Sequence, residues 1–179
     1  MDYTLKFPLN ELHELAARYI AGNNDRANEY LIEGTIGPMV KKRGWYTKPE
    51  FLLLCRWKTP RTQPRCREND PAYIQEITSI ALGTSSERLR IEVLTLLNGV
   101  SWPTASVLLH FAHQDRYPIL DFRAVESLNI TKPNAYDFDF WQEYVSICRG
   151  LAVQTGVDMR TLDRALWQHS REHPIVAPA

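Results

Sequence analysis

The sequence has few cysteines and no long apolar segment. Its three cysteines, Cys55, Cys66 and Cys148, are an odd number without a CxxC spacing, so neither a disulfide framework nor a zinc ribbon is indicated. We expect each to be a reduced structural thiol. No apolar run approaches the roughly 18 to 20 residues of a transmembrane helix, and Met1–Lys6 lacks the basic and apolar stretches of a signal peptide. We therefore expect a cytoplasmic protein with no membrane partner.

The motifs of several enzyme classes are also missing. The chain has no GxGxxG or Walker loop and no GxSxG elbow, which leaves nucleotide-driven and serine-hydrolase chemistry without support. His110 and His113 lie three residues apart, but partners at metal-ligand spacing are lacking. We expect no metal site.

What is present indicates a folded globular protein. The 179 residues are 44% hydrophobic and 23% charged, close to the averages of soluble domains, which excludes a disordered or fibrous chain. The length fits a single domain over residues 1–179, or one that is split into two lobes. Helical periodicity dominates, and no period-2 pattern of a strand is found. We predict an all-α, two-lobed domain and expect a monomer.

Local signals place the helices. Asn10 is the expected N-cap of the first one, and Thr47–Glu50 and Thr84–Glu87 read as capping boxes. Residues 59–71, rich in Pro, Thr and Arg, are expected to form a loop, and residues 173–179 a frayed tail. The predicted helices cover residues 11–21, a stretch from 26 that is interrupted at Gly34 and Gly37–Pro38, 51 to before 60, 71–82, 84–97, 104–113, 122–128, 138–154 and 159–169.

One segment carries most of the positive charge. The formal net charge of the chain is zero, yet residues 41–67 hold nine basic residues and one acidic residue. Aromatic side chains are interleaved with these charges, and such rings can stack on nucleic-acid bases. A basic patch on an acidic body indicates a polyanionic partner; a solvated basic loop without a ligand is the alternative. The basic residues are Lys41, Lys42, Arg43, Lys48, Arg56, Lys58, Arg61, Arg65 and Arg67.

A short turn joins two apolar helices at Leu97–Ser101. Because Gly99 has no side chain, a nucleic-acid backbone could approach it closely, and the first amides of the helix that begins around Pro103 could bind a phosphate. An ordinary helical hairpin without a ligand is the alternative.

This turn resembles a known motif. The residues Leu97–Ala105, LNGVSWPTA, are similar to the helix-hairpin-helix of DNA glycosylases, LPGVGxKTA. Downstream, Tyr117–Val125, YPILDFRAV, resembles the segment that places an aspartate at a helix start in that superfamily, most closely in adenine-mismatch glycosylases. The resemblance is specific over Glu87–Leu128, with the helix-hairpin-helix at about 85–113. It implies a glycosylase-like fold of the HhH-GPD type and double-stranded DNA as partner.

The resemblance also implies roles for residues. Asp121 takes the place of the essential aspartate, which would stabilise the oxocarbenium-like transition state and orient the attacking water. Its alternative is a plain helix N-cap. The implied DNA-binding hairpin and helix start consist of Gly99, Val100, Ser101, Thr104 and Ala105.

Three departures from the family pattern matter. Ser101 replaces the second hairpin glycine, which would change the approach of the backbone or any monovalent cation held there. Pro103 stands where bifunctional members have a Schiff-base lysine, so strand cleavage by that route is not implied. Only Cys148 follows Asp121, which excludes the four-cysteine iron–sulfur cluster of many relatives. Apart from that cation, we expect no cofactor.

The basic segment would supply the rest of the site. Arg56, Lys58 and Arg61 could hold distorted phosphates or hydrogen-bond the leaving base. A base pocket or wedge is expected from Trp45, Tyr46 and Trp57, for which a place in the core is the alternative. The resemblance, together with this segment, therefore implies a monofunctional DNA glycosylase that flips and excises a damaged or modified base in DNA repair or in attack on modified foreign DNA. The alternatives are a helix-hairpin-helix DNA-binding module without catalysis and a helical interaction protein.

Overall fold

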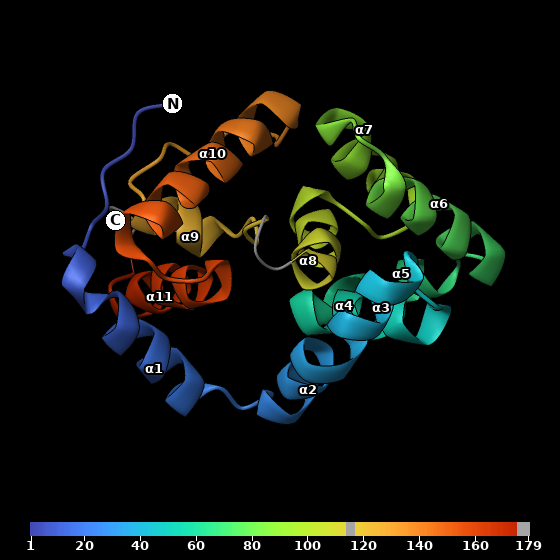
Figure 1. The fold of residues 1–179 in the computed structure, drawn as a ribbon, viewed down its shortest axis with the longest axis horizontal. Coiled ribbons are helices and arrows are strands. Elements are labelled where there is room, and N and C mark those ends of the chain that lie inside the picture. Colours follow the sequence, from blue (N-terminus) through green and yellow to red (C-terminus); the bar gives the residue numbers. More distant parts are fainter. Residues whose placement is uncertain (114–116, 175–179) are drawn as a thin grey trace. The chain divides into compact units, whose positions relative to one another are not determined.

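The computed structural model describes residues 1–113 and 117–174, and this part of the chain forms helices and no strand (Figure 1). The prediction of an all-α fold is confirmed for these residues. None of their helices is both long enough and apolar enough to cross a bilayer. Of the predicted tail, residues 175–179 lie outside the described part. The chain divides into a terminal unit, Met1–Asn24 with Leu120–Ala179, and a central unit, Asp25–Ile119.

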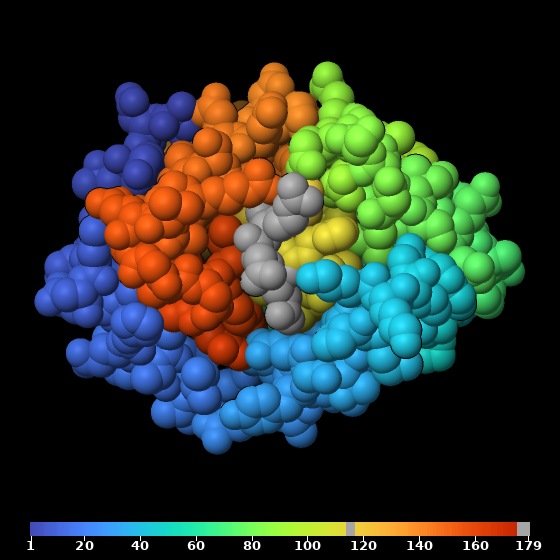
Figure 2. Space-filling view, viewed as in Figure 1, coloured from blue at the N-terminus to red at the C-terminus, as the bar shows by residue number. Residues whose placement is uncertain are grey.

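The terminal unit is built around its last helix. Helix α11 packs against the three other helices of the unit, because Leu162, Ala165 and Leu166 recur at helical spacing and are fully buried. Figure 2 shows the N-terminal segment, in blue, against the red and orange C-terminal segment of this unit. Its elements are a 3₁₀ turn at Leu9–Glu11, α1 (Leu12–Gly22), α9 (Phe122–Ser127), α10 (Phe138–Thr155) and α11 (Met159–Glu172).

The start of α1 differs from the prediction. Asn10 lies inside the 3₁₀ turn, and Glu11 takes the N-cap position of α1 without a side-chain hydrogen bond. Pro8 explains this start: its carbonyl oxygen accepts the Glu11 amide at 3.0 Å, which closes a tighter turn before the α-helix begins.

The central unit surrounds α8. All residues of this helix from Thr104 to Ala112 are buried, and it packs against α3, α4 and α7. The elements are α2 (Arg26–Leu31), a π-helical turn η2 (Ile32–Ile36), α3 (Gly37–Arg43), α4 (Lys48–Lys58), a 3₁₀ turn η3 (Pro60–Thr62), α5 (Gln63–Arg67), α6 (Pro71–Gly83), α7 (Glu87–Glu92), a 3₁₀ turn η4 (Val93–Leu96) and α8 (Trp102–Ala112).

The α-helix is interrupted at the expected place, but the interruption is a π turn and not a break in the helical path. The chain stays helical there because the wider π turn at Ile32–Ile36 accommodates the ring and the missing amide of Pro38. Gly37 is needed for packing: a Cβ atom at this position would lie 2.6 Å from the carbonyl oxygen of Phe111.

The loop expected over residues 59–71 was wrong. It contains η3 and α5, each with a proline in its first turn. Proline is tolerated there because the first amides of a helix have no intrahelical acceptor. These prolines therefore begin helical turns. The side chains of α5 have the fixed spacing of a helix and not the variable spacing of a loop.

The two predicted capping boxes have different outcomes. The first is confirmed, since the Thr47 amide donates to Glu50 Oε2 at 2.8 Å and the reciprocal bond is present. In the second segment the cap is Ser86, whose hydroxyl accepts the Leu89 amide at 3.2 Å. Thr84 instead accepts the Ser86 amide at 3.1 Å, so α7 begins at Glu87, later than predicted.

Candidate nucleic-acid interface

The turn between η4 and α8 is a closed hairpin. The Leu97 amide donates to the Leu94 carbonyl oxygen at 3.2 Å, and the Val100 amide donates to the Leu97 carbonyl oxygen at 3.0 Å. Gly99 has φ +81°, a backbone conformation that glycine adopts without steric cost. The local helix-turn-helix geometry expected from the sequence is therefore present.

The reason for glycine at position 99 differs from the expected one. A Cβ atom there would lie 2.7 Å from the sulfur of Cys66 and 3.1 Å from the carbonyl oxygen of Thr62. The side of Gly99 that would carry a side chain therefore faces α5 and the turn before it. Its backbone angle and the contact with this segment require glycine before any ligand is considered.

The hairpin offers backbone donors. Ser101 is the N-cap of α8 and makes no side-chain capping bond. The first helical bond runs from the Ala105 amide to the Ser101 carbonyl oxygen at 2.8 Å. In the part of the chain that the structure describes, the amides of Gly99 and Ser101 form no hydrogen bond. Amides of this kind at a helix start attract anions.

A groove of about 310 Å³ borders the hairpin. Its walls come from the hairpin segment Thr95–Ser101 and from two residues outside it, Thr62 and Arg65. Arg65 is exposed on α5 and brings one cation of the basic segment to the hairpin. Sequence reasoning did not select Arg65 as a contact, because a loop over residues 59–71 gave no helical register that would place Arg65 beside the hairpin. Pro64, which precedes Arg65, was the available signal, because proline is common in the first turn of a helix.

Five of the other basic residues fall into two groups. Arg43 pairs with Glu50, and the Lys48 ammonium donates to the Arg67 carbonyl oxygen at 2.8 Å, so these charges serve the fold. The predicted contacts are placed differently: Arg56 and Arg61 are exposed and Lys58 is half-buried. Among the described residues, the lining of the hairpin groove includes none of these three.

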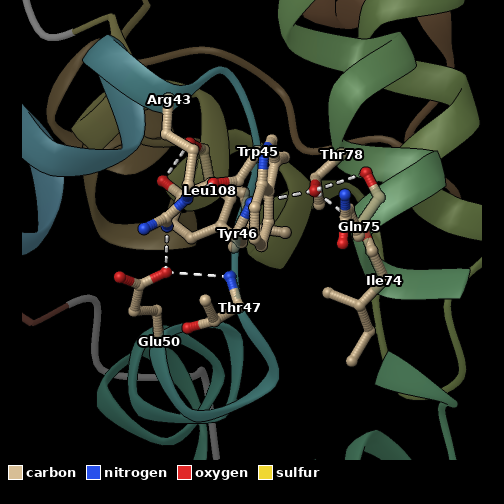
Figure 3. A network of polar contacts seen from close by, with 9 residues as sticks. All are labelled: Arg43, Trp45, Tyr46, Thr47, Glu50, Ile74, Gln75, Thr78 and Leu108. Carbon is tan, nitrogen blue, oxygen red and sulfur yellow. Dashed lines mark hydrogen bonds and ion pairs between the residues drawn. The ribbon is translucent and has the colours of Figure 1, made fainter. Parts of the chain in front are cut away.

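Tyr46 is a core residue, which corrects its assignment to the base pocket. Its side chain is fully buried, its hydroxyl donates to the Leu108 carbonyl oxygen at 2.7 Å, and its amide donates to the Thr78 hydroxyl at 3.0 Å (Figure 3). Burial, with a smaller effect of the Glu50 charge, raises the pKa of Tyr46. A ring sealed in this way cannot stack on a base.

The two tryptophans of the segment are half-buried. The guanidinium carbon of Arg43 lies 4.4 Å from the ring centre of Trp45, so one face of this ring is already covered by a cation. Trp57 meets Phe111 of α8 edge-on, with ring centres 5.3 Å apart. Their role as a base wedge stays a prediction.

The cysteines agree with the expected reduced thiols, since all three are free and buried. Cys66, which lies against Gly99, differs from the others in its acidity. A hydrogen bond from the Cys55 thiol outweighs the opposing effect of burial and, together with the bond between Cys66 Sγ and the Thr62 hydroxyl, lowers the pKa of Cys66 to about 7.

In the terminal unit, Asp121 is the N-cap of α9. Its Oδ1 accepts the Arg123 amide at 3.0 Å, and its carbonyl oxygen accepts the Val125 amide at 3.0 Å. The residue is half-buried. The capping role is therefore confirmed, and the catalytic role stays a prediction.

An aromatic residue that the sequence analysis did not select lies within electrostatic range of Asp121. Burial, and secondarily the charge of Asp121, raises the pKa of Tyr136. Its phenol oxygen is buried and has no hydrogen-bond partner among the described residues, and its ring centre lies 5.2 Å from that of Phe140. A neutral phenol thus lies near this carboxylate. Only its position in the linker after α9 could have singled it out.

No group of three or more His, Cys, Asp or Glu side chains within residues 1–113 and 117–174 is arranged to hold a metal ion. The monovalent cation at the hairpin stays a prediction.

Comparison with known proteins gives one structural similarity. No family model matches the chain, and no curated protein matches it. A solved structure of an 8-oxoguanine glycosylase/lyase from Methanocaldococcus jannaschii, in complex with a 15mer DNA containing 8-oxoguanine, is similar with 15% sequence identity and a TM-score of 0.45. The match covers 94% of this chain and 84% of that chain. Similarity at this level carries no conclusion about the activity of the present chain.

Proposed function

We propose that the chain is a monofunctional DNA glycosylase that binds double-stranded DNA through its hairpin and hydrolyses the N-glycosidic bond of a modified base. The observation that carries the proposal is the hairpin itself. The amides of Gly99 and Ser101, which form no hydrogen bond with the residues that the structure describes, lie just before an eleven-residue helix and next to a groove that contains Arg65. Donors, helix dipole and a cation favour the same ligand, a phosphate of the nucleic-acid backbone.

Asp121 would carry the chemistry. Breaking an N-glycosidic bond places positive charge on the sugar, and an ionised carboxylate stabilises that charge. The same carboxylate can orient the water that adds to the anomeric carbon while the base leaves. At the start of α9 its Oδ1 accepts the Arg123 amide at 3.0 Å, and this bond orients the carboxylate.

A hydrolytic reaction fits the hairpin better than a lyase reaction. Pro103 lies in the first turn of α8 at the position of the family's Schiff-base lysine, and it offers no nucleophilic amine. Water is therefore the expected nucleophile, and the phosphodiester strand is expected to stay intact after the base has left.

The direct test is a base-release assay on a panel of labelled duplexes, each with one modified base. The proposal expects release from at least one duplex, with strand breaks only after alkali treatment. Strand breaks without alkali would contradict the monofunctional assignment. An absence of release on every duplex, together with salt-dependent binding, would contradict catalysis.

That last outcome describes the second candidate, a DNA-binding module that has lost catalysis. It is favoured by one observation: the bond from the Arg123 amide to Asp121 is what any N-cap aspartate makes. Under this alternative the hairpin keeps its phosphate-binding role, and substitutions at position 121 change only stability.

A further inference from the structure

A buried asparagine connects the hairpin to the loop between α5 and α6. Asn69 is 2% exposed. Its side-chain nitrogen donates to the carbonyl oxygens of Cys66 and Asn98, both at 2.9 Å. Its side-chain oxygen accepts the Asn98 backbone amide at 2.8 Å. Both backbone groups of Asn98 are therefore paired with one side chain 29 residues away.

These bonds determine how the next peptide group is oriented. The carbonyl of Asn98 and the amide of Gly99 belong to the same peptide bond, which is planar. Holding the carbonyl oxygen toward Asn69 therefore fixes the direction in which the Gly99 amide points. That amide is one of the two in the hairpin that form no hydrogen bond among the described residues.

The packing of Gly99 supports the same constraint. Its backbone lies directly against Cys66, whose carbonyl oxygen also accepts the Asn69 side chain. Two contacts therefore hold the Asn98–Gly99 peptide: the hydrogen bonds between Asn69 and Asn98, and the packing of Gly99 against Cys66 of α5. The Asn98–Gly99 peptide group cannot rotate without breaking these hydrogen bonds.

We propose that Asn69 is a positioning residue for DNA binding: it orients the Asn98–Gly99 peptide so that the Gly99 amide donates to a backbone phosphate. This inference rests on the proposed DNA-binding function of the hairpin. Aspartate at this position would keep the acceptor for the Asn98 amide but lose both donated bonds. Alanine would lose all three.

The first measurement uses the free protein. Hydrogen exchange of the Asn98 amide is compared in the native chain, Asn69→Asp and Asn69→Ala. We expect protection of this amide to fall about tenfold or more in Asn69→Ala and less in Asn69→Asp. Unchanged protection in Asn69→Ala would overturn the proposal, because the pairing would then not hold the turn.

The second measurement is DNA affinity at several salt concentrations, using an unmodified duplex as the probe. We expect Asn69→Ala to bind about tenfold more weakly at every salt concentration with an unchanged salt slope, because the Gly99 amide is neutral and no cation is lost. Asn69→Asp serves if the alanine variant does not fold, and is expected to weaken binding as well.

The matched control is Thr78→Val, in the same unit. Thr78 is also fully buried and also pairs with backbone groups, donating to Ile74 and accepting from Tyr46, but it does not line the hairpin groove. We expect this variant to be destabilised and to bind DNA like the native chain.

The outcomes separate the two proposals. Native affinity in both Asn69 variants, or an equal loss in Thr78→Val, would overturn the role of Asn69 and leave the DNA-binding function intact. A native chain without salt-dependent binding would overturn the DNA-binding function, and the role of Asn69 with it.

Discussion

Gly99 lies so close to Cys66 that a Cβ atom on the glycine would stand 2.7 Å from the sulfur and 3.0 Å from the backbone nitrogen of the cysteine. The hairpin is thus part of the packed core of the central unit on one side and a donor surface on the other. A bulky substitution at Gly99 would disturb the fold first, so a loss of DNA binding in such a variant would not locate the binding site.

Gly99→Ala is expected to lower the free energy of unfolding by about 2 to 4 kcal/mol, because the left-handed backbone and the contact with Cys66 both oppose a side chain. The control is Gly150→Ala. Gly150 lies inside α10, and its Cβ would meet nothing within 4 Å. This second variant is expected to be more stable by up to about 1 kcal/mol. Urea unfolding measures the free energy of unfolding of both variants. Equal changes in the two would contradict the packing argument for Gly99.

Tyr46→Phe tests the correction of the base pocket. Loss of the bond to the Leu108 carbonyl oxygen should cost about 1 kcal/mol of unfolding free energy, with DNA affinity and base release unchanged. Tyr30→Phe, at a side chain that is 56% exposed, should leave stability unchanged. If Tyr46→Phe bound DNA more weakly and was as stable as the native chain, the assignment of Tyr46 to the core would be contradicted.

Arg65→Ala tests the groove beside the hairpin. If this guanidinium neutralises one phosphate, the slope of log affinity against log salt concentration should fall by about one unit, with the same loss on every duplex sequence. Arg88→Ala is the control, since Arg88 is exposed, pairs with Glu92 and does not line the groove. Identical slopes in the two variants would place Arg65 outside the interface.

The pH dependence of stability should contain a contribution from His169. Burial, followed by the charges of His173 and Lys6, lowers the pKa of this imidazole below 6.5, while the charges of Glu172 and Glu11 act against the shift. The folded state thus disfavours the proton. This group therefore lowers stability as the pH falls through 6.5, and costs nothing above it.

Unfolding of the native chain and of His169→Gln at pH 7.5 and pH 5.5 measures this contribution. The native chain is expected to lose more stability on acidification than the variant. The Ser127 hydroxyl, 3.1 Å from His169 Nδ1, and the stacked ring of His173 are the neighbours that a proton would disturb. An equal loss in both chains would contradict the assignment.

Local patterns in the sequence predicted local structure well. The Thr47–Glu50 capping box and the hairpin at Leu97–Ser101 depend on residues a few positions apart, and both are present. The burial of Tyr46 could not be predicted in this way, because it depends on Leu108, 62 residues away. Charges and aromatics in one segment indicated an exposed surface, whereas tertiary packing divides them between core and surface.

The packing of α5 against the hairpin was not predicted from the sequence, for a related reason. Prolines in residues 59–71 suggested a loop, although a proline in a first helical turn is equally compatible with α5. Without α5, neither the place of Arg65 in the groove nor the contact of Cys66 with Gly99 could be inferred. The pairing of Asn69 with Asn98 has no local sequence signature at all.

Substitutions at Asp121 can separate its proposed catalytic role from its role as the N-cap of α9. Asparagine is as good an N-cap as aspartate, so Asp121→Asn should keep the bond to the Arg123 amide and unfold within about 0.5 kcal/mol of the native chain. Asp121→Ala should lose about 1 kcal/mol through the missing cap. Only the asparagine variant therefore removes the charge and leaves the helix start intact.

The decisive measurement is the single-turnover rate of base release by Asp121→Asn and the native chain, on a duplex that the native chain processes and both chains bind equally. The proposal predicts a fall of at least about a hundredfold, because the sugar cation loses its counter-charge and the water its base. Equal rates in the two chains would show that this carboxylate only caps α9.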